Sequence, residues 1–111
     1  MTTLKVVKSI NPKKDLATDE CVVLALEGRT SRLMMGSRSQ DLTMIALDKD
    51  SIVAIEHVKK GGMRELPRCT VVIEASGDLH GEIAGKVKGV KLSKKTVELQ
   101  TGDTKKKGKK K

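Results

Sequence analysis

Short aliphatic runs, each the length of one β-strand, recur along this 111-residue chain and end at or near turn residues. Runs of this kind, bounded by Gly, Pro, Asn, Asp or Ser, are typical of strands. Their regular spacing predicts an all-β fold, either a small antiparallel barrel or a two-layer sheet. The expected strands span residues 4–10, 21–26, 32–35, 42–47, 52–58, 69–75, 79–84, 87–92 and 96–100, and a short helix fits only at 13–20.

Two of these runs, 21–26 and 42–47, are largely apolar on both faces of a strand. Strands of that composition lie centrally between two layers or at a contact between subunits. The run 69–75 alternates more clearly and can keep one solvated side. In the last expected strand, Val97 and Leu99 share the face that we expect to point inward.

The chain contains no Phe, Trp or Tyr, although 37% of its residues are hydrophobic. Its core must therefore be built from Val, Ile, Leu, Ala and Met, which predicts modest stability or help from a partner. Proteins that hold unpaired bases usually stack them on aromatic rings. That mode is excluded here, so any contact with nucleic acid must rest on phosphates and on Arg planes.

Positive charge is concentrated at the C-terminal end. Residues 104–111 hold six of the 23 Lys and Arg residues and no acid, so without them the net charge falls from +9 to +3. A dense run of like charges repels itself and buries nothing, which predicts a disordered tail after a single β-rich domain at 1–103. The alternative is a solubilising tail or a cloning remnant. The tail lysines expected to contact a polyanion are Lys105, Lys106, Lys107, Lys109, Lys110 and Lys111.

A second group of lysines lies in the segment GKVKGVKLSKK at 85–95. Lys86 and Lys88 share one face of the expected strand, and Gly89 permits a bulge that changes the register. A basic strand that continues into a lysine arm favours a polyanion-binding surface. The alternative is an edge strand that its lysines protect from aggregation. The remaining candidate lysines of this segment are Lys91, Lys94 and Lys95.

Three arginines, Arg29, Arg32 and Arg38, surround two methionines and a glycine. Guanidinium groups match phosphate oxygens in a bidentate fork, so this segment is a second candidate for phosphate binding. The alternative is a charged loop beside a strand, with Glu27 and Asp41 near enough in sequence to offset its charge.

His57 and His80 are the only histidines, and Glu56 and Glu82 lie close to them in sequence. Such residues can bind a metal ion if their strands pair. They are more often solvent-facing strand positions, and neither a third His nor closely spaced cysteines are present. We therefore expect no metal site and no cofactor.

The two cysteines, Cys21 and Cys69, each open an aliphatic run and form no CxxC pair, so they resemble buried thiols. A disulfide between them stays geometrically possible. The segment around Asp48 and Asp50 lacks the Gly and distal Glu of a calcium loop and is typical of a hairpin turn. The sequence contains no nucleophile elbow, phosphate loop or HExxH motif, which favours a protein that is not an enzyme.

The first ten residues lack the charged-then-apolar order of a secretory leader, since two lysines interrupt the apolar residues. No run is long and apolar enough for a transmembrane segment. These features predict a cytoplasmic, reduced protein.

The layout CVVLALEG…LTMIALDKDSIVAIEHV, within residues 21–58, distantly resembles the small bent barrels of the Sm-like family. That family's pattern of RNA-contacting Asp and Asn is not evident here, so the resemblance assigns no functional residue.

Two functions fit these observations. The first is a small basic protein that binds DNA or RNA mainly through phosphate contacts, with low sequence specificity. The second is a structural or assembly protein, a homo-oligomer or virus-like particle component, that uses its aliphatic strands and contacts an acidic partner with its tail. The fate of the runs at 21–26 and 42–47 separates them, because burial within one chain favours the first and sharing between subunits favours the second.

Overall fold

The computed structural model describes residues 2–7, 16–35, 40–49, 51–83 and 87–101. The tail lysines, Lys86 and Arg38 lie outside these ranges, and so do residues 13–15 of the helix expected at 13–20. In chain order the elements are β1 (Thr2–Val6), β2 (Glu20–Met35), β3 (Leu42–Asp48), β4 (Ser51–Val58), β5 (Met63–Ser76), α1 (Asp78–Ile83), β6 (Val87–Leu92) and β7 (Thr96–Thr101).

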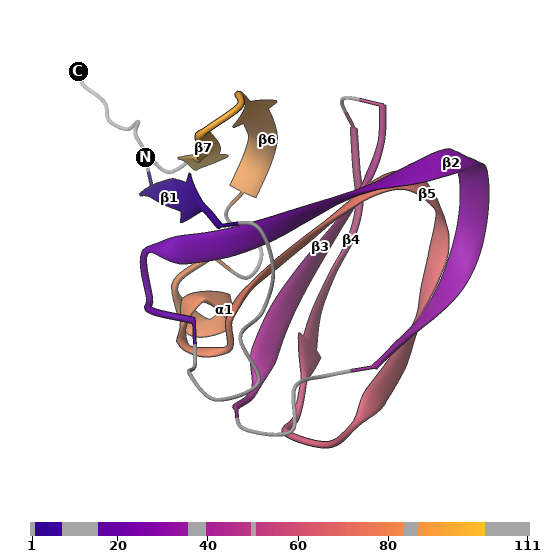
Figure 1. Ribbon diagram of the computed structural model, residues 1–111, viewed down its shortest axis with the longest axis horizontal. Coiled ribbons are helices and arrows are strands. Elements are labelled where there is room, and N and C mark those ends of the chain that lie inside the picture. The colour runs from indigo at the N-terminus through magenta and orange to yellow at the C-terminus, as the bar shows by residue number, and fades with distance from the viewer. Residues whose placement is uncertain (1, 8–15, 36–39, 50, 84–86, 102–111) are drawn as a thin grey trace.

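The strands form one sheet in the order β4-β3-β5-β2-β1-β7-β6 (Figure 1). Strand β1 runs parallel to β2, whereas every other neighbouring pair is antiparallel. The sheet curves until its two edge strands, β4 and β6, approach each other, so that it is nearly closed into a barrel. The expected all-β fold is therefore confirmed.

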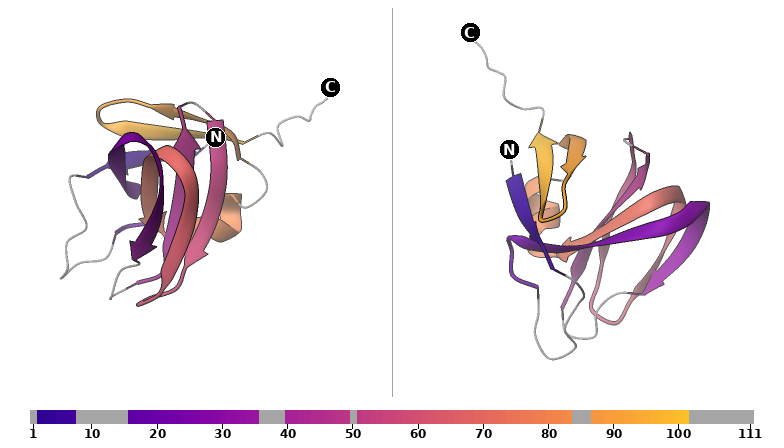
Figure 2. Two further views of the ribbon diagram at one scale, coloured as in Figure 1. Left: turned by 90° about the vertical axis from the view of Figure 1, so that its right-hand side faces the viewer. Right: turned by 45° about the horizontal axis from the view of Figure 1, so that its top comes forward.

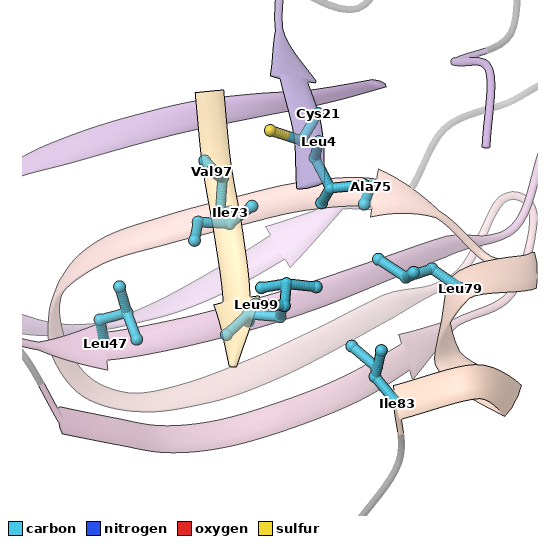
Figure 3. Close-up of a cluster of buried hydrophobic side chains, with 10 residues drawn as sticks. Leu4, Cys21, Leu47, Ile73, Ala75, Leu79, Ile83, Val97 and Leu99 are labelled. Atoms are coloured by element: carbon cyan, nitrogen blue, oxygen red, sulfur yellow. The ribbon is translucent and has the colours of Figure 1, made fainter. Parts of the chain in front are cut away.

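The first of two apolar cores lies inside this curved sheet (Figure 3). Val97 and Leu99 of β7 point inward, as their spacing predicts, and both are fully buried. Leu79 and Ile83 of α1 close one side of the core. The other fully or almost fully buried members are Leu4, Cys21, Ile45, Leu47, Ile73 and Ala75.

The second core lies on the other face of β3, because β2 and β5 are much longer than their neighbours. Beyond the stretch that pairs with β3, the two strands continue as a two-stranded ribbon. This ribbon bends and returns alongside the β3–β4 hairpin (Figures 1 and 2). The second core therefore combines ribbon residues with residues of β3 and β4, namely Met34, Leu66, Cys69, Leu42, Met44 and Val58, among others.

Irregular pairing explains the bend of the ribbon. Between the pairs Ala25↔Val71 and Thr30↔Cys69, β2 is longer than its partner, and Gly28 has a φ of 81° there. Such extra residues bend a strand and increase its twist. Glu27 and Gly28, a pair typical of a turn, therefore lie in a bulge, and the two strands expected at 21–26 and 32–35 are one continuous strand.

The two apolar runs differ in burial. All six residues of 42–47 are buried, because one core covers each face of β3. This confirms its central position between two layers within a single chain. In 21–26, Cys21 and Val22 are buried, whereas Ala25 is exposed and the other three residues are partly buried. The run at 21–26 is thus central only at its first two residues.

The strand expected at 79–84 is wrong, since α1 covers Asp78–Ile83. Leu79 and Ile83 lie four residues apart, so a single helical turn places both on the core. The backbone N–H of His80 donates a hydrogen bond to the carbonyl oxygen of Gly77 (3.1 Å), and this bond begins the helical turn. The described end of 13–20, from Leu16 onward, is not helical either. No helix in the described ranges is long and apolar enough to cross a membrane.

Candidate functional site

Strand β6 carries the predicted basic segment at one edge of the sheet. It pairs only with β7, and the register shifts between Val87 and Gly89. This shift is the bulge that the glycine predicts, and it leaves Lys88 exposed. Lys91 is also exposed, while Val87 and Val90 pack against the core. The strand thus presents its lysines to solvent and its valines inward.

The turn that joins β6 to β7 presents Lys94 and Lys95, and both are exposed. Ser93 and Thr96 close the turn through a backbone hydrogen bond of 3.0 Å and a hydroxyl contact of 2.7 Å. The backbone N–H of Val6 also donates to the carbonyl of Lys95 (2.8 Å), which ties the turn to β1. These bonds fix the backbone while both ammonium groups stay in water.

The outer face of this hairpin is not purely basic. Lys91 lies directly opposite Glu98 of β7, so their side chains share a face and that acid offsets one positive charge. None of the four described lysines, Lys88, Lys91, Lys94 and Lys95, forms an ion pair with a described residue. Their charges therefore remain available to an external anion.

The last described residue of the hairpin, Thr101, lies at the end opposite the turn, and the lysine tail follows it in sequence. Val87 pairs with Thr101 at that end, whereas Leu92 pairs with Val97 beside the turn. Lys94 and Lys88 are six residues apart, which spans roughly 20 Å of extended chain. Candidate cations therefore lie along the whole length of the hairpin, from the turn to the start of the tail.

The arginine segment lies elsewhere. Arg32 pairs with Leu66 on the bent ribbon, and Arg29 belongs to the bulged part of β2. The ribbon curves away from the β6–β7 hairpin in both figures of the whole chain (Figures 1 and 2). The structure describes the backbone of these two arginines but not their side chains, so the segment is a separate candidate surface.

A polar pocket of about 280 Å³ lies at the C-terminal end of β4. Its walls come from the residues before β3, the end of β4 and the link between β5 and α1. The lining residues are Gln40, Asp41, His57, Ser76, Gly77 and Asp78.

Gly77 allows the walls of this pocket to approach each other. Its N–H donates to the carbonyl of Asp41 (2.8 Å), and a Cβ at this position would lie 2.6 Å from the Cβ of Asp41. Asp41 also accepts a hydrogen bond at Oδ1 from the backbone N–H of Lys60 (2.7 Å). Its carboxylate is thus held from the β4–β5 turn, and its backbone carbonyl from the link before α1.

The ring of His80 lies beside that of His57, which lines this pocket, although 23 positions separate the two residues in sequence. The ring centroids of His57 and His80 are 5.4 Å apart, and Nε2 of His57 is 3.5 Å from Oδ2 of Asp41. The sequence pointed to Glu56 and Glu82 as the neighbouring carboxylates, but the pocket is lined by Asp41 and Asp78 instead. No local signal identifies Asp41, since only tertiary folding brings it to the histidines.

The thiols show no sign of a nucleophile. Cys21 and Cys69 are both buried, as expected, and no disulfide joins them. Burial raises the pKa of the Cys21 thiol to about 11, so this thiol stays protonated at neutral pH and is a poor nucleophile.

Comparison of the chain with protein-family models, with curated proteins and with solved structures finds no match. The resemblance of residues 21–58 to Sm-like barrels therefore gains no support from relatives.

Proposed function

We propose that this protein binds nucleic acid through phosphate contacts with low sequence specificity, using the β6–β7 hairpin and the lysine tail. The observation that carries the proposal is the exposure of all four described lysines of the hairpin, with no ion pair to any described acid. Four such cations on a braced hairpin, joined to six more in the tail, form a strongly cationic surface.

The absence of Phe, Trp and Tyr favours a duplex or a structured strand over unpaired bases, because no aromatic ring is present for stacking. The only helix within the described ranges, α1, has six residues and packs on the core. This short, packed helix is not available to read bases in the major groove, so the binding energy would come from contacts with phosphates.

The burial of β3 on both faces within one chain also supports this proposal over assembly. The assembly alternative drew on two-sided apolar strands, whose second face another subunit would cover. Here the bent ribbon covers the second face of β3. Absence of nucleic-acid binding in the experiment below would favour assembly, through homo-oligomerisation or an acidic partner, over this proposal.

The test is fluorescence anisotropy of labelled duplex DNA, duplex RNA and single-stranded RNA across a salt series. Three proteins are compared with the full chain: one ending at Asp103, the double variant Lys94→Gln/Lys95→Gln, and the matched control Lys59→Gln/Lys60→Gln. Both doublets are adjacent exposed lysines in turns between strands, so they remove equal charge from different places.

Each phosphate contact contributes about 0.9 to the salt slope on a duplex. The Lys94/Lys95 variant is therefore expected to lower that slope by about 2, whereas the control leaves it close to that of the parent chain. Equal losses in both variants would show that only net charge matters. Complete loss on truncation alone would assign all binding to the tail, and no binding by the full chain near physiological salt would overturn the proposal.

A further inference from the structure

We propose that His57 and His80 together bind one divalent transition-metal ion, such as Zn²⁺, at the mouth of the polar pocket. The ion would join α1 to the end of β4, two elements that β5 separates in sequence. This inference is independent of the lysine hairpin.

The spacing of the two imidazoles carries the inference. Metal–nitrogen bonds of about 2.0–2.1 Å at tetrahedral angles place two ring centroids roughly 5 Å apart. The observed separation is 5.4 Å, and the ring planes are tilted by 50°. The rings are therefore not stacked face to face, and rotation of the His80 ring about its χ2 angle lets one of its nitrogens face an ion bound to His57.

Asp41 supplies the second feature of such a site. A histidine that binds a metal ion through one nitrogen usually directs the other toward a carboxylate, which fixes the ring and makes it a stronger ligand. Nε2 of His57 lies 3.5 Å from Oδ2 of Asp41, and the other carboxylate oxygen is held by the N–H of Lys60. This arrangement leaves Nδ1 of His57 for the ion and makes Asp41 a positioning residue.

The pocket provides room for the remaining ligands. Among the described residues, no group of three or more His, Cys, Asp or Glu side chains is arranged to hold a metal ion. The protein therefore contributes two imidazoles, and water completes the coordination within the polar pocket. A site with open positions binds its ion less tightly than a closed four-ligand site, so micromolar rather than nanomolar affinity is expected. The two cysteines are buried in the cores and do not compete.

The composition of the chain gives an unusually clean experiment. Because there is no Phe, Trp or Tyr, the aromatic region of the proton NMR spectrum contains carbon-bound protons of His57 and His80 alone. The untagged full chain is titrated with Zn²⁺ at pH 7.5, and calorimetry measures affinity and stoichiometry in parallel. The expected result is one ion per chain, with both imidazoles shifting or broadening along one common binding curve.

Three variants and the unfolded chain complete the test. His57→Gln and His80→Gln should each abolish the response of the remaining imidazole at Zn²⁺ concentrations that saturate the parent chain. Asp41→Asn keeps the oxygen that accepts from Lys60 and should weaken Zn²⁺ binding by about 10- to 100-fold, whereas the control Glu65→Gln, at an exposed position that does not line the pocket, should not. Far-UV circular dichroism verifies that each variant is folded.

The proposal is overturned if the two imidazoles follow different binding curves, if only one responds, or if neither responds at millimolar Zn²⁺. It is also overturned if the chain in urea binds Zn²⁺ as tightly as the folded chain, because the site would then owe nothing to the fold.

Discussion

Strands β3 and β6 have similar lengths but opposite surroundings. Six consecutive residues of β3 are buried, between one core on each face and a hydrogen-bonded neighbour on each edge. Strand β6 has one neighbour, buries its valines only in part and exposes both of its described lysines. The first strand is constrained at every position by packing, whereas the second is constrained on one face and free to bind on the other.

This difference separates residues that hold the fold from residues that are free to serve a function. Substitutions on β3 should change stability first, and any loss of function should follow from unfolding. Substitutions of exposed lysines on β6 should leave stability almost unchanged, so a change in binding there reports on the surface itself.

The largest expected effect is on β3. Ile45→Ala removes a fully buried side chain from the first core and should lower the free energy of unfolding by about 2–5 kcal/mol. Lys91→Ala on β6 is the control and should change it by no more than about 0.5 kcal/mol. Urea unfolding followed by far-UV circular dichroism measures both. Similar values for the two variants would remove the contrast between the strands.

An intermediate effect is expected at Glu74, which β5 places between Val22 of β2 and Met44 of β3. Its side chain is buried, and this desolvation raises the pKa of the carboxyl above its ordinary value of 4.5. The folded state therefore holds this proton more tightly than the unfolded state, and stability falls as pH rises from about 4.5 through the raised pKa.

Glu74→Gln removes this penalty and should make the protein more stable at pH 7, with the advantage shrinking as pH falls to 4.5 and below. Thermal unfolding from pH 4 to pH 8 measures the difference from the parent chain. Glu65→Gln, at an exposed position of the same strand, is the control. An advantage that stays constant with pH would show that ionisation of Glu74 is not its source.

The smallest effect on stability is expected when Lys88, Lys91, Lys94 and Lys95 are all replaced by Gln. Each site is exposed, so the change per site should stay within about 0.5 kcal/mol. Two measurements distinguish the roles of these lysines: light scattering over days reports aggregation, and fluorescence anisotropy reports nucleic-acid binding. Aggregation with unchanged binding would favour edge protection as the role of these lysines, and lost binding in a soluble monomer would favour the proposed interface.

Much of the sheet could be predicted because its signals are local. Val97 and Leu99 alternate with polar residues, Gly89 marks its bulge, and Asp48 and Ser51 flank a hairpin turn in which Lys49 has a φ of 58°. Each of these features depends on a few consecutive residues.

The features that escaped prediction depend on residues far apart in sequence or on ambiguous patterns. The pattern of Leu79, Gly81 and Ile83 is compatible with both a strand and a helical turn. Only the packing of Leu79 and Ile83 against the core favours the helix. Similarly, no local pattern in the sequence predicts that Asp41 lies beside His57 at a pocket. The lysine hairpin was visible in the sequence because charge accumulates there, but its bracing by β1 was not.

Strand β1 lies between β2 and β7, so the first described strand in the sequence pairs with the last. During synthesis, Leu4 emerges before any other core residue but can be enclosed only once Val97 and Leu99 have left the ribosome. Such distant pairing makes the final step of folding slow. A nascent chain that still lacks β7 exposes aliphatic surface, and one side of the first core is closed only after β7 has been synthesised.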